Sequence, residues 1–206
     1  MGLLDILLGR TKPVLPDLDR LFGLPSAAVT LQAAAGFTPT GGGSVCFATV
    51  EGAAFDDVRE EVRELLDADA ERTGPPVELV RDEFGYSWLV SRRGSEELPA
   101  LVGDLHAVNS ALEASGFGPQ LLCSVVGFER SGDGGEGGGP SRLGLVYLYK
   151  RGSFYPFAPL GDGGGGSRGQ RRDSSLELQV RAVLSGDLRI EEDLDRWFPV
   201  WGAPGL

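Results

Sequence analysis

Two stretches of the chain place apolar residues on one face of a helix. In the first stretch the apolar residues are Phe55, Val58, Val62, Leu65 and Leu66, and charged residues occupy the other face. The second stretch repeats this spacing from Leu98 to Leu112. Residues 74–76 (Gly-Pro-Pro) and Gly116 follow the two stretches, as is typical where helices end. The pattern predicts two amphipathic helices, and each of them needs an apolar surface to cover.

Short apolar runs provide such a surface. They lie at 44–50, 77–81, 86–91, 120–128 and 143–150, and they are rich in β-branched and aromatic residues. The second and third runs flank a turn at Gly85, and the last two are nearly continuous in apolar residues, so each pair is expected to lie side by side. The sequence therefore predicts an α+β fold with a mainly antiparallel sheet of about five or six strands and flanking helices.

Glycine-rich stretches divide the chain. Twelve of the 32 glycines lie in 131–141 and 161–173, whose composition has little to bury and predicts two flexible loops, the second also rich in arginine. Before them, residues 1–40 are interrupted by prolines, which predicts a lead-in of a short apolar helix, turns and extended pieces. We expect the α+β core at 41–160, with its first strand following the glycines at 41–43.

The C-terminal section, 174–206, is expected to form helices that pack on the core. Ser174 and Glu177 fit a capping box at the start of the first helix, which ends at Gly186. A further helix is predicted from the spacing of its apolar residues, and Pro199 is expected to end it. These apolar residues are Ile190, Leu194, Trp197 and Phe198.

An excess of acidic residues restricts the partners of the chain. The 19 Lys and Arg residues against 30 Asp and Glu residues give a net charge of −11, which disfavours nucleic acid as a partner. No apolar run approaches the ~20 residues of a membrane span, and no positive residue precedes the N-terminal apolar run as in a signal peptide. Cys46 and Cys123 are far apart and form no CxxC pattern, which does not fit an oxidised secreted scaffold. We expect a cytoplasmic protein, with peripheral attachment to the inner face of the membrane left open.

Few residues are available for metal binding or nucleophilic catalysis. With one histidine, His106, and two cysteines, the sequence predicts no metal site. Two G-x-G-x-x-G matches fall inside the glycine tracts and open no helix, so we expect no cofactor and no small-molecule substrate. Cys123 with His106 is the one candidate for an enzyme site, but an apolar strand favours core positions for Cys123 and Cys46. The adjacent acids Glu191 and Glu192 are assigned to a solvated face or a helix start.

Both ends of the sequence carry apolar residues that are candidates for partner contact. One alternative is that they pack on the chain's own domain, and composition does not choose between the two. A second alternative for the N-terminal segment is insertion into a membrane interface. The candidates are Leu3, Leu4, Leu7, Leu8, Trp197, Phe198 and Trp201.

Segments spread along the chain resemble one known family. They are GLLD (2–5), LPSAAVTL (24–31), GFTPTG (36–41), DLHAVN (104–109), GFGPQLLC (116–123), RWFP (196–199) and WGAPGL (201–206). Together they are similar to the PspA-associated protein PspAB family. The resemblance implies association with the membrane-stress system built around PspA, and it carries over no catalytic residues.

The expected function is therefore that of a non-catalytic cytosolic adaptor, which binds PspA or another component of its system. Two other functions remain open. One is a peripheral lipid-binding sensor of membrane stress, and the other is an enzyme that uses Cys123 and His106.

Overall fold

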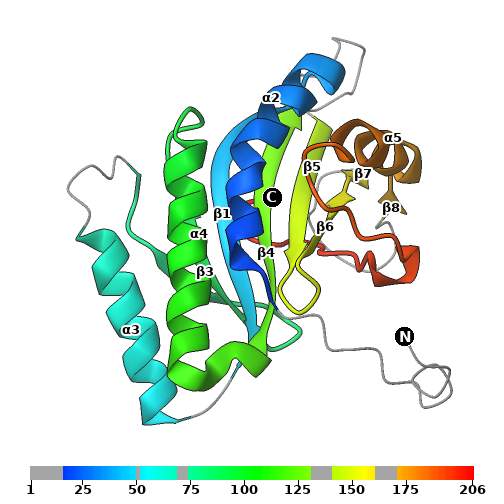
Figure 1. The fold of residues 1–206 in the computed structure, drawn as a ribbon. Helices are drawn as coiled ribbons and strands as arrows, with labels where there is room; N and C mark the ends of the chain where they lie inside the picture. Colours follow the sequence, from blue (N-terminus) through cyan, green and yellow to red (C-terminus); the bar gives the residue numbers. More distant parts are fainter. Residues whose placement is uncertain (1–15, 50–51, 69–73, 131–140, 161–170) are drawn as a thin grey trace, which may run out of the picture.

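Six antiparallel strands form the central sheet (Figure 1). The computed structural model describes residues 16–49, 52–68, 74–130, 141–160 and 171–206. In chain order the strands are β1 (Thr38–Ala48), β2 (Glu78–Arg81), β3 (Tyr86–Arg92), β4 (Leu121–Arg130), β5 (Ser141–Leu148) and β6 (Ser153–Phe157). Across the sheet their order is β2-β3-β1-β4-β5-β6, and every neighbouring pair is antiparallel. The predicted α+β class and antiparallel sheet are confirmed.

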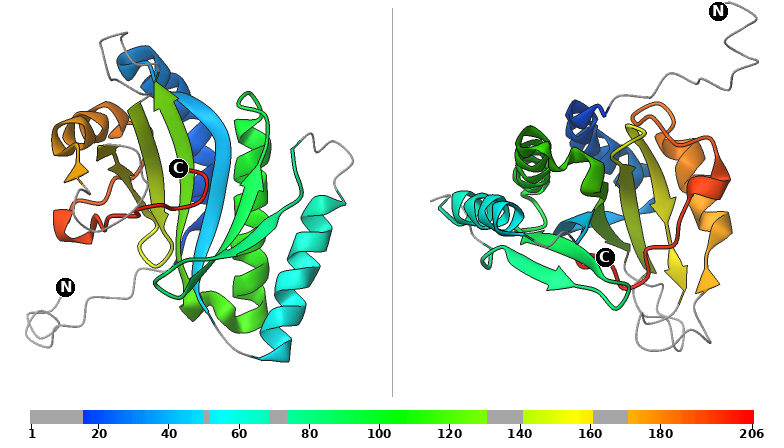
Figure 2. Two further views of the ribbon diagram at one scale, coloured as in Figure 1. Left: turned by 180° about the vertical axis from the view of Figure 1, so that it is seen from behind. Right: turned by 90° about the horizontal axis from the view of Figure 1, so that it is seen from below.

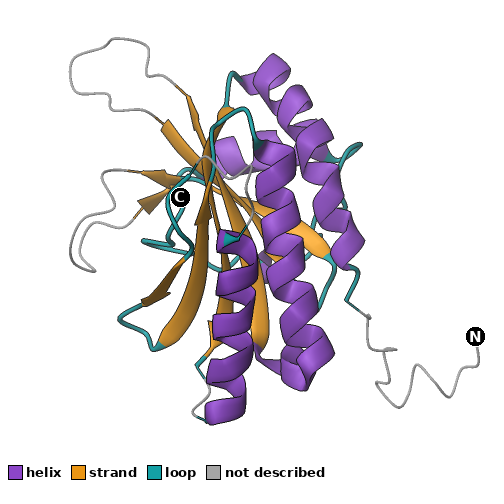
Figure 3. Ribbon diagram, turned by 90° about the vertical axis from the view of Figure 1, so that its left-hand side faces the viewer, coloured by secondary structure: helices purple, strands orange, loops and turns teal. Residues whose placement is uncertain are grey.

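Helices cover one face of this sheet. The helices are α2 (Leu24–Ala35), α3 (Ala53–Asp67), α4 (Leu98–Leu112) and α5 (Ser174–Leu184), with helical turns η1 (Leu18–Gly23), η2 (Glu113–Phe117), η3 (Gly118–Gln120) and η4 (Leu194–Arg196). In the side view of Figure 3 the helices lie on one side of the strands. Figure 2 shows the C-terminal segment crossing the strands on the other side. Helix α5 packs against α2 and β6.

The core between helices and sheet is closely packed. Leu101 and Leu105 of α4 are at most 1% exposed, and each buried leucine contributes about 1.5–3 kcal/mol relative to an exposed one. Helix α3 is anchored by Phe55, whose ring lies edge-on to Phe47 of β1 at 5.4 Å and to Phe117 at 4.8 Å. The two amphipathic helices predicted from spacing are thus confirmed as α3 and α4.

A buried ion pair connects α4 to the sheet. The Arg93 side chain, directly after β3, donates from Nη2 to Asp104 Oδ1 at 2.7 Å and from Nε to Oδ2 at 3.0 Å. Ser91 donates to the same Oδ2 at 2.6 Å. Both charged side chains are about 5% exposed or less. Two parallel hydrogen bonds of this kind fix the orientation of both groups, so they set the position of α4 along β3.

The three glycines at 41–43 lie inside β1, whereas the sequence places them before it. A Cβ on Gly43 would lie 3.2 Å from Leu105 Cδ1 on the helical face, and one on Gly42 would lie 2.9 Å from Gly205 O on the other face. Gly41 has φ +80°, where the pairing of β1 with β4 shifts register. The glycines are therefore part of the strand because other segments approach its backbone closely.

The N-terminal lead-in is more regular than predicted. Residues 24–35 form α2, and Pro25 lies in its first turn, where a missing N–H costs no hydrogen bond. Strand β1 begins at Thr38 instead of Ser44. Of the two predicted loops, 131–140 and 161–170 lie outside the described residues, but Ser141 begins β5. Residues 171–172 form β8 (Arg171–Arg172), which pairs with β7 (Pro159–Leu160).

The C-terminal section also differs from prediction. Helix α5 is capped by Asp173, whose Oδ1 accepts the Leu176 N–H at 3.0 Å, so no capping box forms from Ser174 and Glu177. The predicted helix around Leu194 is only the 3-10 turn η4, and Ile190 instead makes a parallel bridge to Phe154 in β6. The apolar residues of this segment are spaced as in a helix. The segment is nevertheless extended, because its backbone pairs with the edge strand β6 at Ile190.

The ion pair beneath α4 makes a testable contribution to stability. Asp104→Asn keeps the shape of the side chain but removes the carboxylate charge that faces the buried Arg93 guanidinium at 2.7 Å. We expect the free energy of unfolding, measured by urea denaturation, to fall by about 3–5 kcal/mol. Glu60→Gln, which removes an exposed partner of Arg63, is the matched control and should change stability by less than about 1 kcal/mol. Equal losses in the two variants would contradict this role of Asp104.

Candidate functional site

The C-terminal segment after α5 covers the second face of the sheet. Trp197 is 5% exposed. Its ring stacks on Tyr155 of β6 at 6.0 Å between centroids, and its Nε1 donates to Glu191 O at 3.0 Å. Trp201 is half-buried and lies edge-on to Phe157 at 4.9 Å. Of the predicted contact residues, these two tryptophans pack on their own domain.

The end of this segment packs against glycines on three strands. A Cβ on Gly127 of β4 would overlap Gly205 O, and one on Gly144 of β5 would lie 2.8 Å from Leu206 Cδ1. With Gly42 of β1 they form a row without side chains, and the backbone of Gly205 lies against it. Ser44 Oγ donates to Pro204 O at 2.7 Å and fixes the segment along the row.

Glu191 is the buried polar anchor of the segment. Its carboxylate, 4% exposed, accepts hydrogen bonds from Ser153 Oγ at 2.8 Å and Arg151 Nε at 3.1 Å. Burial acts to raise the pKa of Glu191, but the hydrogen bonds from Arg151 and Ser153 outweigh it, so this pKa lies below its ordinary value. The assignment of Glu191 to solvated surface is wrong. The local sequence contains no signal for this, because the alternation of Leu188 and Ile190 would place Glu192, and not Glu191, on their side of the segment.

A second buried acid, Glu177 of α5, connects three elements. It accepts from Arg172 Nε at 2.9 Å and from the backbone N–H of Ala158 at 2.9 Å. Arg172 in turn donates from Nη1 to Trp197 O at 2.7 Å. Arg172 was singled out by the sequence only as part of a basic loop, and its pairing with a buried acid had no local signal.

Phe198 is the one predicted C-terminal contact residue whose side chain points into solvent. It is 59% exposed, and Leu194, four residues earlier, is 50% exposed. The backbone at this point is held, because Tyr155 Oη donates to Phe198 O at 2.8 Å. Two apolar side chains are therefore presented to solvent on a fixed backbone, which favours a contact surface.

The other four predicted contact residues, Leu3, Leu4, Leu7 and Leu8, lie outside the described residues. The described chain begins at Pro16. Its start is held by Tyr147 of β5, whose hydroxyl donates to Asp17 O at 2.8 Å. Burial raises the pKa of Tyr147 to about 12.

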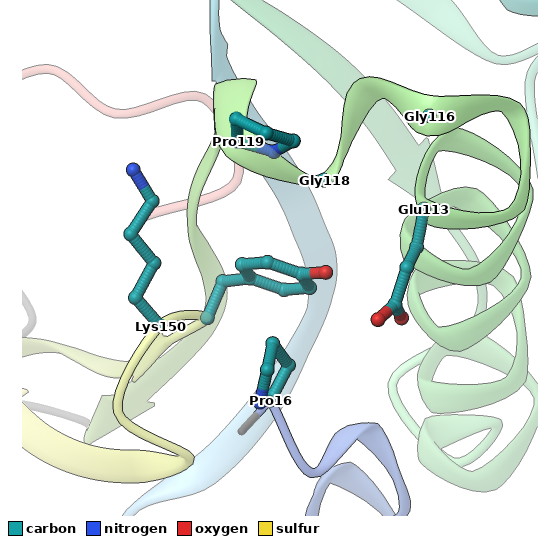
Figure 4. A pocket seen from close by; sticks show the side chains of 7 residues that line it. Pro16, Glu113, Gly116, Gly118, Pro119 and Lys150 are labelled. Atoms are coloured by element: carbon teal, nitrogen blue, oxygen red, sulfur yellow. The ribbon is translucent and has the colours of Figure 1, made fainter. Parts of the chain in front are cut away.

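An open pocket of about 350 Å³ lies beside this start (Figure 4). Pro16, Gly118, Pro119 and the side chains of Glu113, Tyr149 and Lys150 line it. In Figure 4, Lys150 and Glu113 lie on opposite sides of the pocket. Burial and then Glu113 raise the pKa of Tyr149 to about 12, so its hydroxyl is protonated at neutral pH. The pocket thus offers one acid, one amine and one phenol on an open surface.

The structure does not bring Cys123 and His106 together. Cys123 lies in the apolar cluster of the sheet face beneath the C-terminal segment, with Trp197 and Ala203. His106, on the helical face, lies 3.4 Å from Asp19 Oδ1 and packs on Phe22 with ring centroids 4.8 Å apart. The described residues contain no group of three or more His, Cys, Asp and Glu side chains placed to hold a metal ion. Within the same residues, no helix has the length and apolarity needed to cross a membrane.

The pKa of Glu191 predicts a pH-dependent part of the stability. A carboxylate whose pKa is lowered by folding stabilises the protein above its unfolded value of about 4.3, and this contribution is lost as the pH falls through the folded pKa. Glu191→Gln should therefore lower the free energy of unfolding by about 1–3 kcal/mol at pH 7. We expect a smaller loss at pH 3, with urea midpoints as the measurement.

The exposed neighbour Glu192 supplies the matched control for this experiment. Glu192→Gln should leave both midpoints nearly unchanged, because its carboxylate is solvated. An equal loss for Glu191→Gln at both pH values would assign the effect to packing and not to charge.

Comparison with known proteins identifies a family but no solved relative. A family model described as PspA associated protein B (PspAB) matches residues 1–205. No curated protein and no solved structure matches the chain. The family model covers the C-terminal segment and the sheet together, in agreement with the resemblance seen in the sequence. The chain belongs to the PspA associated protein B family.

Proposed function

We propose that this protein is an accessory component of the PspA system that acts by protein–protein contact and has no catalytic activity of its own. The observation that carries the proposal is the match of residues 1–205 to the PspA associated protein B family. In this proposal the protein acts in the cytoplasm and reaches the membrane through its partner.

Phe198 and Leu194 are the proposed contact surface on the described part of the chain. Aromatic residues on a rigid backbone bind at low entropic cost, since little order has to be gained on binding. Tyr155 provides that rigidity at Phe198. The apolar leucines at positions 3, 4, 7 and 8 are proposed as a second contact element, because they have the spacing of a helix that docks on a partner.

The alternative is a lipid-binding sensor that uses the N-terminal segment directly. Residues 1–10 contain one acidic and one basic residue, Asp5 and Arg10. So little positive charge gives weak attraction to anionic lipid, and short segments of this kind bind membranes only marginally. These considerations favour a protein partner over a lipid partner.

Non-catalytic action is supported by the placement of the two candidate catalytic residues. A nucleophile and its base need to lie within hydrogen-bond reach of one another. Cys123 lies on the sheet face beneath the C-terminal segment, whereas His106 lies on α4 and packs on Phe22. The enzyme alternative therefore has no assembled pair to act with.

Binding of purified protein to PspA tests the proposal. Phe198→Ser should weaken binding at least about tenfold, or about 1.4 kcal/mol, if its ring is a central contact. Phe84→Ser is the matched control. Phe84 is 67% exposed in the β2–β3 turn, at the other edge of the sheet, and its replacement should leave binding unchanged.

The same assay, repeated with residues 1–10 deleted and with anionic vesicles, separates the alternatives. Lipid-free binding to PspA that is lost in Phe198→Ser or in the deletion supports direct contact. Binding to vesicles alone would replace the proposal with the lipid-binding function. Absence of binding to both, or equal effects of Phe198→Ser and Phe84→Ser, would contradict it.

A further inference from the structure

Cys46 and Cys123 lie directly opposite each other on the two central strands. The pairing of β1 with β4 places Cys46 against Cys123, and both belong to the same apolar cluster on the sheet face beneath the C-terminal segment. Directly opposed residues of an antiparallel pair have Cα atoms about 4.5–5.5 Å apart and side chains on the same face. A disulfide spans Cα distances of about 4.4–6.8 Å. The register therefore meets the distance requirement without movement of the backbone.

Both side chains are free, buried thiols in the same apolar cluster. The neighbouring Cys123 thiol, and then burial, raise the pKa of Cys46 far above its ordinary value. Cys46 therefore stays a thiol at neutral pH. Cys123 is 9% exposed and Cys46 4%, so Cys123 is the thiol that solvent reaches first.

We propose that Cys46 and Cys123 form a redox modification site, in which a peroxide or a small-molecule disulfide converts the opposed thiols into a reversible cross-strand disulfide. The two residues are the partners of one reaction and not two separate core residues. In a reducing compartment such a bond is transient, which is typical of redox-sensing pairs.

Hydrogen peroxide and the two thiols are the only reactants needed to form the disulfide. The Cys123 thiolate attacks one peroxide oxygen and becomes a sulfenic acid, and the leaving hydroxide takes up the thiol proton as water. The Cys46 sulfur then attacks the Cys123 sulfur, which forms the S–S bond and releases the second water. The two thiols supply both electrons. A dithiol reductant reverses the reaction by thiol–disulfide exchange.

The local structure favours this bond within one chain. The register of β1 against β4 shifts between Cys46 and Phe47, and such a bulge relaxes regular pairing next to the thiols. Trp88 of β3 pairs with Cys46, and Leu148 of β5 pairs with Cys123. Apolar neighbours on both sides keep other chains away from the thiols, so the expected product is a monomer.

Oxidation of the full-length reduced protein tests the proposal. It is exposed under native conditions to hydrogen peroxide or, separately, to oxidised glutathione, and the remaining thiols are alkylated after unfolding. We expect no alkylated thiol, a mass lower by two hydrogens, a peptide that links Cys46 to Cys123, and recovery of both thiols with a dithiol reductant. The oxidised protein should have a higher Tm, because the bond constrains the unfolded chain.

Cys46→Ser and Cys123→Ser are the matched controls. Each should remain folded, form no internal cross-link and show no rise in Tm after oxidation. The proposal is overturned if both thiols of the native protein stay alkylatable under conditions that oxidise the unfolded chain. It is also overturned if the products are cross-linked dimers or if oxidation lowers the Tm.

Discussion

In the described part of the chain no long helix covers the second face of the sheet, so the C-terminal segment has to shield its apolar side chains from water. The rest of the structure depends on this cover. Helices α2, α3 and α4 occupy only one face, while Val90, Val125, Val146 and Phe157 lie on the other. A continuous apolar surface of this kind is unfavourable when it is exposed to water. A segment of backbone with a few large side chains covers it, and the row of glycines on β1, β4 and β5 lets the thinnest part of that segment lie close to the strands.

Two buried acids determine where this segment lies. Burying a carboxylate is costly unless hydrogen bonds replace its water, so Glu177 and Glu191 are stable only where their donors are present. Arg172 and the Ala158 N–H serve Glu177, and Arg151 and Ser153 serve Glu191. A shift of the segment by one residue would separate Glu191 from its donors, and would separate the Trp197 carbonyl from Arg172, which Glu177 holds in place. The tryptophans of the segment bury apolar surface, and the buried acids restrict the segment to one position on the sheet.

Much of the fold was predictable from local pattern, whereas the site was not. Phe55 and Val62 lie at helical spacing on α3, and the glycine at 85 has the positive φ expected of the hairpin turn. In contrast, nothing local distinguishes Ser174 from Asp173 as the cap of α5. The burial of Trp197 and the exposure of Phe198 likewise depend on Tyr155, 42 or 43 positions earlier in the chain. Contacts between distant segments decide such cases, and periodicity carries no information about them.

The segment that covers the sheet is synthesised after all the strands that it covers. Every strand of the sheet precedes residues 197–206, so a ribosome releases all six strands before their cover. At about 5–20 residues per second, the stretch after Phe157 takes seconds to synthesise. During that interval the nascent sheet presents an uncovered apolar face, which a chaperone has to shield or which invites aggregation. During synthesis the sheet therefore has one face uncovered, and the native surface forms only after the two tryptophans of the segment have been translated.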